Sequence, residues 1–271
     1  MAIGCSLSAN ADRVQCTTDV DCTQRGAEFA GSVCVDTWCE PEPTWGCLDS
    51  PVRLSGESGP FPITFHIQDI RMQAPMAGVQ ARLCRKSDVN CDEPEAGVVT
   101  SDERGVVRFA VEAEDPTLGF TGFVLFTGAD LMPGLYFWNR PLLGAVEVPP
   151  VQLFSQADVD ALARQVGALH DPARGIVILN TFDCKNEPAA GVTIMTDGTD
   201  ELSAPFYAND GLPVAKAVAT DRSGYAGLIN VPPGTVNVAG RLDSDRRLVG
   251  TISLRVKPDS ITYSPMVPRG R

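Results

Sequence analysis

Hydrophobic and polar residues alternate along several short stretches of the chain, which is the pattern of β-strands with one buried face. The clearest case is Phe61–Asp69, where Ile63, Phe65 and Ile67 share one face and His66 lies on the other. Because successive side chains of a strand point to opposite faces, His66 is predicted to be solvated rather than to bind a ligand. Further strands are predicted at 79–84, 98–100, 106–111, 120–127, 135–138, 145–153, 175–180, 227–234 (ending in a turn at 230–234), 236–239, 249–256 and 261–263.

One stretch, 155–167, has the period of a helix instead. Ser155 stands at a position suited to an N-cap and Asp158 at the third helical position of a capping box. Apolar residues recur at helical spacing behind them, so the stretch is predicted to be a short amphipathic helix. His170 follows, and a histidine beside a helix end more often supplies a favourable charge there than catalysis.

A motif of turn residues occurs twice in the chain. The first copy has Gly78 and, after an interval, a turn at 102–105, whereas the second has Gly191 and a turn at 221–224. Asp at the start of such a turn bonds the backbone two residues on, and Gly accepts the positive φ that ends it. The predicted fold is therefore mainly β, with two Greek-key β-sandwich domains joined by one short helix and preceded by a small disulfide-rich module.

These patterns divide the chain into four predicted parts. Residues 1–50 form the N-terminus and the disulfide-rich module, and 51–154 the first sandwich. Residues 155–172 hold the connecting helix, and 173–271 the second sandwich.

The chain has 271 residues and a net charge of −12 at pH 7. This acidity argues against a nucleic-acid partner, since phosphate binding needs a basic face. No stretch approaches the ~20 apolar residues of a membrane-spanning helix, so a membrane would be reached only through a lipid anchor. The aromatic residues at 120–138 are expected to fill a sandwich core rather than to form a ligand platform.

Nine cysteines are the most informative part of the composition. Their spacing lacks the paired C-x2-C ligands of zinc sites, so disulfides in an oxidising compartment are the better interpretation. Four cysteines of the N-terminal module allow three pairings, of which we favour Cys16 with Cys34 and Cys22 with Cys39. The remaining candidates are Cys84 with Cys91, which close a short loop, and Cys47 with Cys184, which are left over.

The ninth cysteine, Cys5, follows Ala2, Ile3 and Gly4, and resembles the lipidated cysteine at the end of a bacterial lipoprotein signal. A polar tether follows it, and its lipidation leaves eight cysteines for four bridges. Asp19 and Asp21 lie in the same region. We interpret them as turn formers, because the glycine and the distal glutamate of a calcium loop are missing.

The second copy of the motif resembles a known family. Over 174–242 it has Gly175, Asp183, Pro188, Gly191, Asp221, Gly224 and Gly234 in sequence. This set resembles the carboxypeptidase regulatory-like domain, a transthyretin-like (prealbumin-like) β-sandwich, and the first copy shares fewer of its positions. The N-terminal part resembles secreted lipoproteins of myxobacteria. The resemblance implies a fold and a place in the cell envelope, and it implies no activity.

The predicted function is that of a non-enzymatic lipoprotein with a binding, adhesion or structural role. It would lie in the cell envelope (outer membrane or periplasm, lipid-anchored) or outside the cell, with a protein or carbohydrate partner. One alternative is a carbohydrate- or peptide-binding accessory module. The other is an enzyme on a transthyretin-like sandwich, either a hydrolase or a dioxygenase with two His and two Tyr iron ligands. His66 and His170 lie in different predicted elements, which disfavours that enzyme.

If a small-molecule site exists, the sequence places it at loops that combine aromatic and polar residues. These candidates are Trp138, Asn139, Arg140, Phe206 and Tyr207. No metal site, cofactor or catalytic residue is predicted.

Overall fold

The computed structural model describes residues 16–18, 21, 25, 32–35, 37–41, 44–49, 59–112, 118–209 and 212–268. They form a mainly β protein, as the alternation of the sequence predicts. The chain divides into two compact units, 1–46 and 47–271.

The first unit contains a β-hairpin of β1 (Ser32–Val35) and β2 (Trp38–Pro41). Cys34 forms a disulfide with Cys16, which is one of the favoured pairings. Cys39 is also disulfide-bonded, and its favoured partner Cys22 lies outside the described residues. The carboxylate of Asp21 accepts hydrogen bonds from the backbone amides of Thr17 and Thr18, as expected of a turn former.

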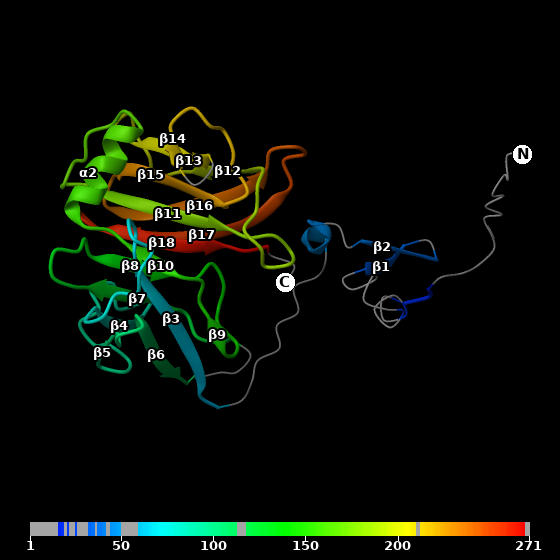
Figure 1. The fold of residues 1–271 in the computed structure, drawn as a ribbon, viewed down its shortest axis with the longest axis horizontal. Helices are drawn as coiled ribbons and strands as arrows, with labels where there is room; N and C mark the ends of the chain where they lie inside the picture. The colour runs from blue at the N-terminus through cyan, green and yellow to red at the C-terminus, as the bar shows by residue number, and fades with distance from the viewer. Residues whose placement is uncertain are drawn as a thin grey trace, which may run out of the picture. The chain divides into compact units, whose positions relative to one another are not determined.

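The second unit is built on one nine-stranded sheet (Figure 1). In spatial order its strands are β14 (Leu212–Val214), β13 (Ala204–Asn209), β15 (Tyr225–Val231), β11 (Gly175–Thr181), β18 (Ile261–Met266), β8 (Gly134–Phe137), β7 (Gly122–Thr127), β4 (Gln80–Arg85) and β5 (Val98–Thr100). Two smaller sheets complete the fold. One contains β10 (Val151–Leu153), β3 (Phe61–Asp69), β6 (Val106–Val111) and β9 (Val146–Glu147), and the other β12 (Val192–Thr196), β16 (Gly234–Leu242) and β17 (Leu248–Val256).

The two sandwiches repeat one strand order. The first sandwich has one layer of β10, β3 and β6 and a second layer of β4, β7 and β8. In the second sandwich, the layer of β18, β11 and β15 corresponds to β10, β3 and β6. The layer of β12, β16 and β17 corresponds to β4, β7 and β8. The nine-stranded sheet arises because edge strand β8 of the first sandwich pairs in parallel with edge strand β18 of the second. The helix is therefore not the only connection between the two predicted domains. They also share a continuous backbone hydrogen-bond ladder.

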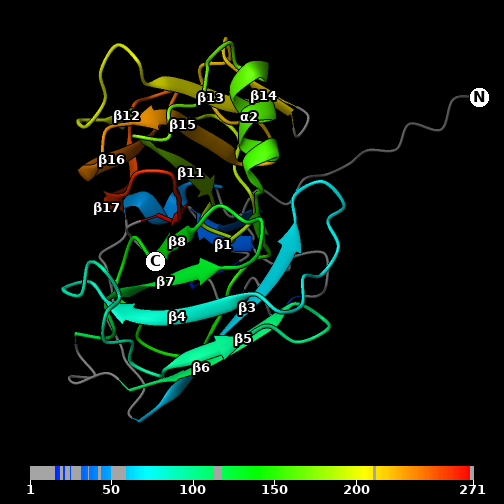
Figure 2. The same cartoon turned by 90° about the vertical axis from the view of Figure 1, so that its left-hand side faces the viewer.

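The smaller sheets cover opposite faces of the shared sheet (Figures 1 and 2). On the first sandwich, Phe65 of β3 packs against Phe126 and Tyr136, with ring centroids 5.3 Å apart in both cases. On the second, β17 contacts β18 and β11, and the Thr262 hydroxyl donates to the Arg255 carbonyl at 2.9 Å. The predicted aromatic core is observed for Phe120, Phe126 and Tyr136, which belong to the buried cluster. Phe123 and Phe137 are also buried, but they stack on each other outside that cluster.

The helix α2 (Gln156–Gln165) begins with the predicted capping box, in which Ser155 and Asp158 bond each other's backbone amides. Its buried residues are Val159, Leu162 and Ala163. They belong to the same core as Ile176 and Ile178 of β11, so α2 covers the outer face of the second sandwich. With α2 on one face and β17 on the other, β11 is buried on both sides. Its near-continuous apolar sequence is the expected consequence.

Both copies of the repeated motif contain the same side-chain hydrogen bonds. The Ser101 hydroxyl accepts from the Val79 amide at 2.9 Å, and the Thr220 hydroxyl accepts from the Val192 amide at 3.0 Å. Each hydroxyl also donates at 2.7 Å to a carbonyl of the preceding loop. The motif thus places the same pair of hydroxyl hydrogen bonds at the equivalent position of each sandwich.

The glycines that end the two turns are required by their surroundings. Gly105 has φ of 72° and Gly224 of 71°. A Cβ at Gly105 would lie 2.3 Å from the Ile67 carbonyl oxygen, and one at Gly224 would lie 2.5 Å from that of Thr181. Only glycine adopts this conformation and leaves room for the neighbouring strand.

The strand pattern departs from the prediction at several places. The stretch 145–153 is two strands, β9 and β10, separated by Pro149 and Pro150, because proline cannot donate to a ladder. The stretch at 120–127 forms a strand only from Gly122 onward. β12, β13 and β14 lie where no strand is predicted; in β13 and β14, Pro205 and Pro213 obscure the pattern.

Candidate functional site

The structure does not bring the five predicted ligand residues together. Trp138, Asn139 and Arg140 line a cleft of about 570 Å³ between the sandwiches. Phe206 lines a different cavity, of about 640 Å³, and Tyr207 lines neither. We call the first hollow the polar cleft and the second the tyrosine chamber.

Tyr207 has a structural role. Its side chain is buried, and its hydroxyl accepts a hydrogen bond from the Ile194 amide at 2.9 Å. Burial raises the pKa of Tyr207 above its ordinary value, so the hydroxyl stays protonated. This hydrogen bond connects β13 to β12 across the two layers of the second sandwich. Tyr207, although predicted as a ligand residue, therefore lines neither hollow.

The polar cleft has a mixed lining. It contains Lys86, Asp197 and Asn237 beside the indole of Trp138. The carboxylate of Asp197 accepts hydrogen bonds from the backbone and side-chain amides of Asn237, at 2.8 and 2.7 Å. Asp197 and Asn237 therefore already satisfy each other, whereas Nε1 of Trp138 and Oδ1 of Asn139 are buried without a partner among the described residues. The chamber is the stronger candidate because its lining is richer in aromatic residues, with Tyr136, Tyr225, Tyr263, Phe154 and Phe206.

The floor of the tyrosine chamber is one face of the shared sheet. Tyr136 of β8 and Ile178 of β11 are the two register partners of Tyr263 in β18, so these three side chains stand in one row. Phe206 of β13 pairs with Gly227 of β15. A Cβ at Gly227 would lie 2.4 Å from the Phe206 ring, which shows that this ring lies over the glycine.

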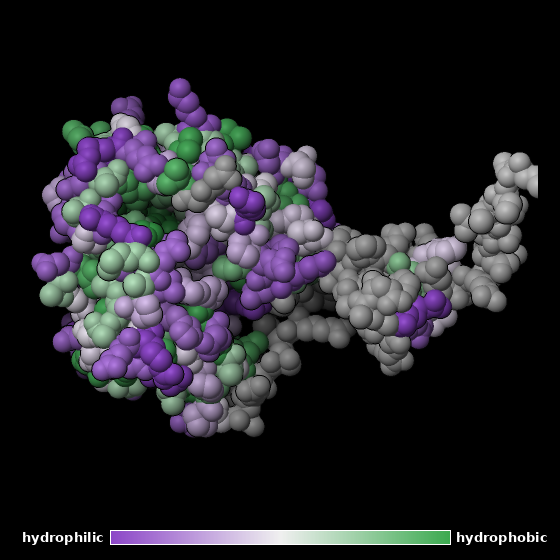
Figure 3. All heavy atoms as spheres, viewed as in Figure 1, coloured by the Kyte–Doolittle hydropathy of each residue, from purple (hydrophilic) through white to green (hydrophobic). Residues whose placement is uncertain are grey.

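The walls come from α2 and from the first sandwich. Leu162 and Gln165 of α2 line one side, and Val151 and Phe154 line another. Figure 3 shows hydrophobic residues set back among hydrophilic ones on the face that carries α2. The chamber is thus a place where the helix and the first sandwich leave part of the sheet uncovered.

At the chamber, Arg71 forms an ion pair and hydrogen bond with Asp158. Burial raises the pKa of Asp158, but hydrogen bonds from Ser155 and Arg71 outweigh it and lower the pKa below its ordinary value. The carboxylate is therefore charged at neutral pH, and its charge is compensated by Arg71.

The tyrosines of the chamber are neutral. Burial raises the pKa of Tyr136, Tyr225 and Tyr263 above the ordinary tyrosine value. Each keeps its proton at physiological pH and remains a hydrogen-bond donor as well as an acceptor. The chamber thus offers uncharged aromatic groups with polar tips.

Two polar atoms of the chamber are buried without a partner within the described part of the chain. They are the hydroxyl oxygen of Tyr263, a residue that is only 6% exposed, and Oδ1 of Asn180. A buried polar group without a hydrogen bond destabilises a fold by roughly 1–3 kcal/mol. Because both residues line the chamber, a molecule bound there would supply the missing hydrogen bonds.

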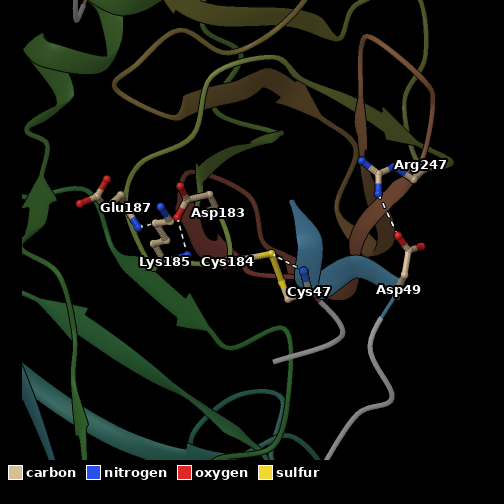
Figure 4. Close-up of a disulfide and its surroundings, with 7 residues drawn as sticks. All are labelled: Cys47, Asp49, Asp183, Cys184, Lys185, Glu187 and Arg247. Carbon is tan, nitrogen blue, oxygen red and sulfur yellow. Dashed lines mark hydrogen bonds and ion pairs between the residues drawn. A yellow bond between two sulfur atoms is a disulfide. The ribbon is translucent and has the colours of Figure 1, made fainter. Parts of the chain in front are cut away.

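Two disulfides stabilise the second unit. Cys84 pairs with Cys91 and Cys47 with Cys184, the pairings predicted from the sequence. Cys47 lies in the short helix η2 (Gly46–Asp49), and its amide donates to the Cys184 sulfur at 3.1 Å (Figure 4). Nearby, Asp49 forms an ion pair with Arg247 at 3.1 Å. Cys5, the predicted lipidation site, lies outside the described residues.

The histidines do not join the tyrosines. His66 is partly exposed and its Nε2 lies 2.5 Å from the Glu147 carboxylate. The His170 side chain is buried, with Nδ1 3.0 Å from the Gln156 side-chain amide. It therefore lies along α2 towards its first turn, not at the end of the helix where the sequence suggested a favourable charge. Neither histidine lines the chamber, so the ligand set of two His and two Tyr is not assembled.

Sequence reasoning missed the chamber. The prediction that Tyr136 lies in the core is confirmed, but nothing in the local pattern marks Asn180 or Tyr263 as site residues. Alternation puts Tyr263 and Ile261 on one face of a strand, but it cannot show that this strand lies beside Tyr136. Within the described ranges, no group of three His, Cys, Asp or Glu side chains is suited to hold a metal ion.

No family model and no curated protein matches the chain. Among solved structures, it is similar to the Bacillus anthracis TIE protein, with 11% identity and a TM-score of 0.24, over 77% of this chain and 34% of that one. A shaft pilin SpaA from Lactobacillus rhamnosus GG has 12% identity and a TM-score of 0.26, over 78% and 98% of the two chains.

An intradiol ring-cleavage dioxygenase from Tetranychus urticae has 14% identity and a TM-score of 0.22, over 33% of this chain and 58% of that one. The chain spans about a third of the length of the TIE protein and 63% of that of a streptococcal ancillary pilin. At TM-scores of this size, function has to be argued from the site itself. Among the described residues, no helix is long and apolar enough to cross a bilayer.

Proposed function

We propose that the chain is a non-enzymatic binding protein of the cell envelope or the extracellular space, and that the tyrosine chamber is its binding site. The observation that carries this proposal is the buried, unpartnered pair of polar atoms in an apolar cavity of about 640 Å³. Ligand pockets have volumes of roughly 300–1,000 Å³ and combine apolar walls with a few convergent polar groups.

The disulfides support the location. Structural disulfides form and persist in oxidising compartments, and the second unit alone contains two. A lipid on Cys5 would anchor such a protein to a membrane, and the resemblance to carboxypeptidase regulatory-like domains and myxobacterial lipoproteins agrees with that address. The net charge of −12 agrees with a partner that is not a nucleic acid.

The chemistry of the chamber supports binding over catalysis. General acid–base catalysis needs a group whose pKa lies near the operating pH. The tyrosines have pKa values raised by burial, and Asp158 has a lowered pKa and an Arg71 partner. These groups can position a molecule, but they are poorly suited to move its protons at neutral pH.

The test closes the chamber from its helical wall. Ala161 of α2 is exposed and lines the chamber, whereas Ala157, one turn earlier, is exposed and does not. Saturation-transfer NMR should detect at least one of toluene, p-cresol and cyclohexanol on the native protein and on Ala157→Trp. Ala161→Trp should abolish the signal, because the indole fills the cavity. Equal signals from the two variants, or no bound probe on the native protein, would refute the proposal.

A further inference from the structure

The lining of the chamber restricts what can occupy it. We propose that its ligand is an uncharged molecule with a flat apolar ring and a hydroxyl or amide group that hydrogen-bonds both Tyr263 and Asn180. This inference rests on the proposed function, since it names the class of molecule that the binding site takes.

The ring follows from the walls. Tyr136, Tyr263 and Phe206 present aromatic surfaces from the floor, and Phe154 and Leu162 present apolar surfaces from the walls. Aromatic rings prefer offset or edge-to-face contacts with other flat apolar groups. A flat apolar ring therefore fits this lining better than a flexible polar chain.

The polar group follows from the two unpartnered atoms. Ile178 is the register partner of Tyr263, and Asn180 lies two residues farther along the same face of β11, a rise of about 7 Å. Tyr263 has a proton to donate, and Oδ1 of Asn180 has lone pairs to accept one. A hydroxyl is both an acceptor and a donor, and so is an amide. One such group on the ligand can accept from Tyr263 and donate to Asn180.

The absence of charge follows from the electrostatics. The tyrosines are neutral, and the charged side chains Arg71 and Asp158 neutralise each other. An ionised ligand would lose its hydration and meet no opposite free charge among these groups, which is strongly unfavourable. A carboxylate version of the same ring should therefore bind much more weakly.

The test compares molecules that share one ring. p-Cresol carries the ring and the hydroxyl, toluene the ring alone, and 4-methylbenzoate the ring with a charge. By NMR titration of the native protein, p-cresol should bind about 3- to 10-fold more tightly than toluene, the gain of about one hydrogen bond. The affinity of 4-methylbenzoate should be at least about 10-fold lower than that of p-cresol. Methyl α-glucopyranoside, rich in hydroxyls, should not compete.

Variants assign the effect to named atoms. Tyr263→Phe and Asn180→Leu should each reduce the affinity for p-cresol towards that for toluene, and leave the affinity for toluene within about twofold. Tyr207→Phe is the matched control, since that buried hydroxyl lies outside the chamber, and it should keep the native preference.

The outcomes separate the two proposals. If toluene and p-cresol bind equally, or if both chamber variants keep the native preference, the ligand class is wrong while the binding site stands. Tighter binding of 4-methylbenzoate or of the glucoside than of p-cresol would overturn the ligand class in the same way. If none of the probes binds, the chamber is not a binding site and both proposals fail.

Discussion

The bridge between Cys47 and Cys184 should contribute more to stability than any local contact of these residues. The two cysteines are 137 residues apart in sequence, whereas Cys84 and Cys91 are 7 apart. In the chain-entropy treatment, a bridge stabilises by restricting the unfolded chain, and its effect grows with the logarithm of the loop it closes. These separations correspond to about 5 kcal/mol for the long loop and about 2.4 kcal/mol for the short one.

The two bridges make a matched comparison, because each double alanine variant removes one disulfide. Cys84 and Cys91 are 0% and 1% exposed, whereas Cys184 is 7% exposed and Cys47 is only half-buried. Lost packing would therefore make the Cys84→Ala/Cys91→Ala variant the less stable of the two. Lost chain restriction predicts the reverse order, by about 2–3 kcal/mol.

Guanidinium unfolding without reductant, followed by tryptophan fluorescence, measures both variants against the native chain. Loss of the long-range bridge should also raise the m-value, because the unfolded chain then exposes more surface. A stability loss of about 5 kcal/mol is a large part of the 5–15 kcal/mol typical of a folded protein. If the Cys84→Ala/Cys91→Ala variant loses as much stability as the other or more, the chain-entropy reasoning is refuted.

Two further predictions concern single residues. Gly227→Ala should lower the free energy of unfolding by about 1–3 kcal/mol, because its Cβ would overlap the Phe206 ring and the Val177 carbonyl; unchanged thermal unfolding would contradict the packing described. For Asp21, hydrogen bonds from Thr17 and its neighbour lower the pKa from 3.8 to about 2, which NMR titration can measure. Since the folded pKa is depressed, its contribution to stability is present above pH 3.8 and is lost as the pH falls through about 2; a midpoint near 3.8 would show that these bonds are absent in solution.

Local features of this protein could be predicted from its sequence because they depend on near neighbours. The faces of β3 follow from alternation, and the start of α2 follows from Ser155 and Asp158. The turns ending at Gly105 and Gly224 follow from their Asp and Gly residues. Strands interrupted by proline, such as β13, gave too weak a pattern. The cysteine pairings within the second unit followed from spacing and elimination, not from a view of the fold.

The candidate site could not be predicted in the same way. Its central row joins Tyr136 to Tyr263 through the parallel pairing of β8 with β18, whose strands are more than a hundred residues apart. No local pattern states which edge strands meet, since any exposed edge offers the same unpaired amides and carbonyls. The predicted ligand loop failed for this reason: Trp138 and Phe206 have suitable chemistry, but the strand order sends them to different hollows.

The sequence by itself determined the periods, the turns and the cap, and with them two β-sandwiches and one helix. Only the tertiary structure decided that the sandwiches share a nine-stranded sheet, that their second layers cover opposite faces, and that α2 leaves a chamber. The physical reason is the range of the interactions. Alternation and turn chemistry act over a few residues, whereas edge pairing and layer packing act between residues that meet only when the chain has folded.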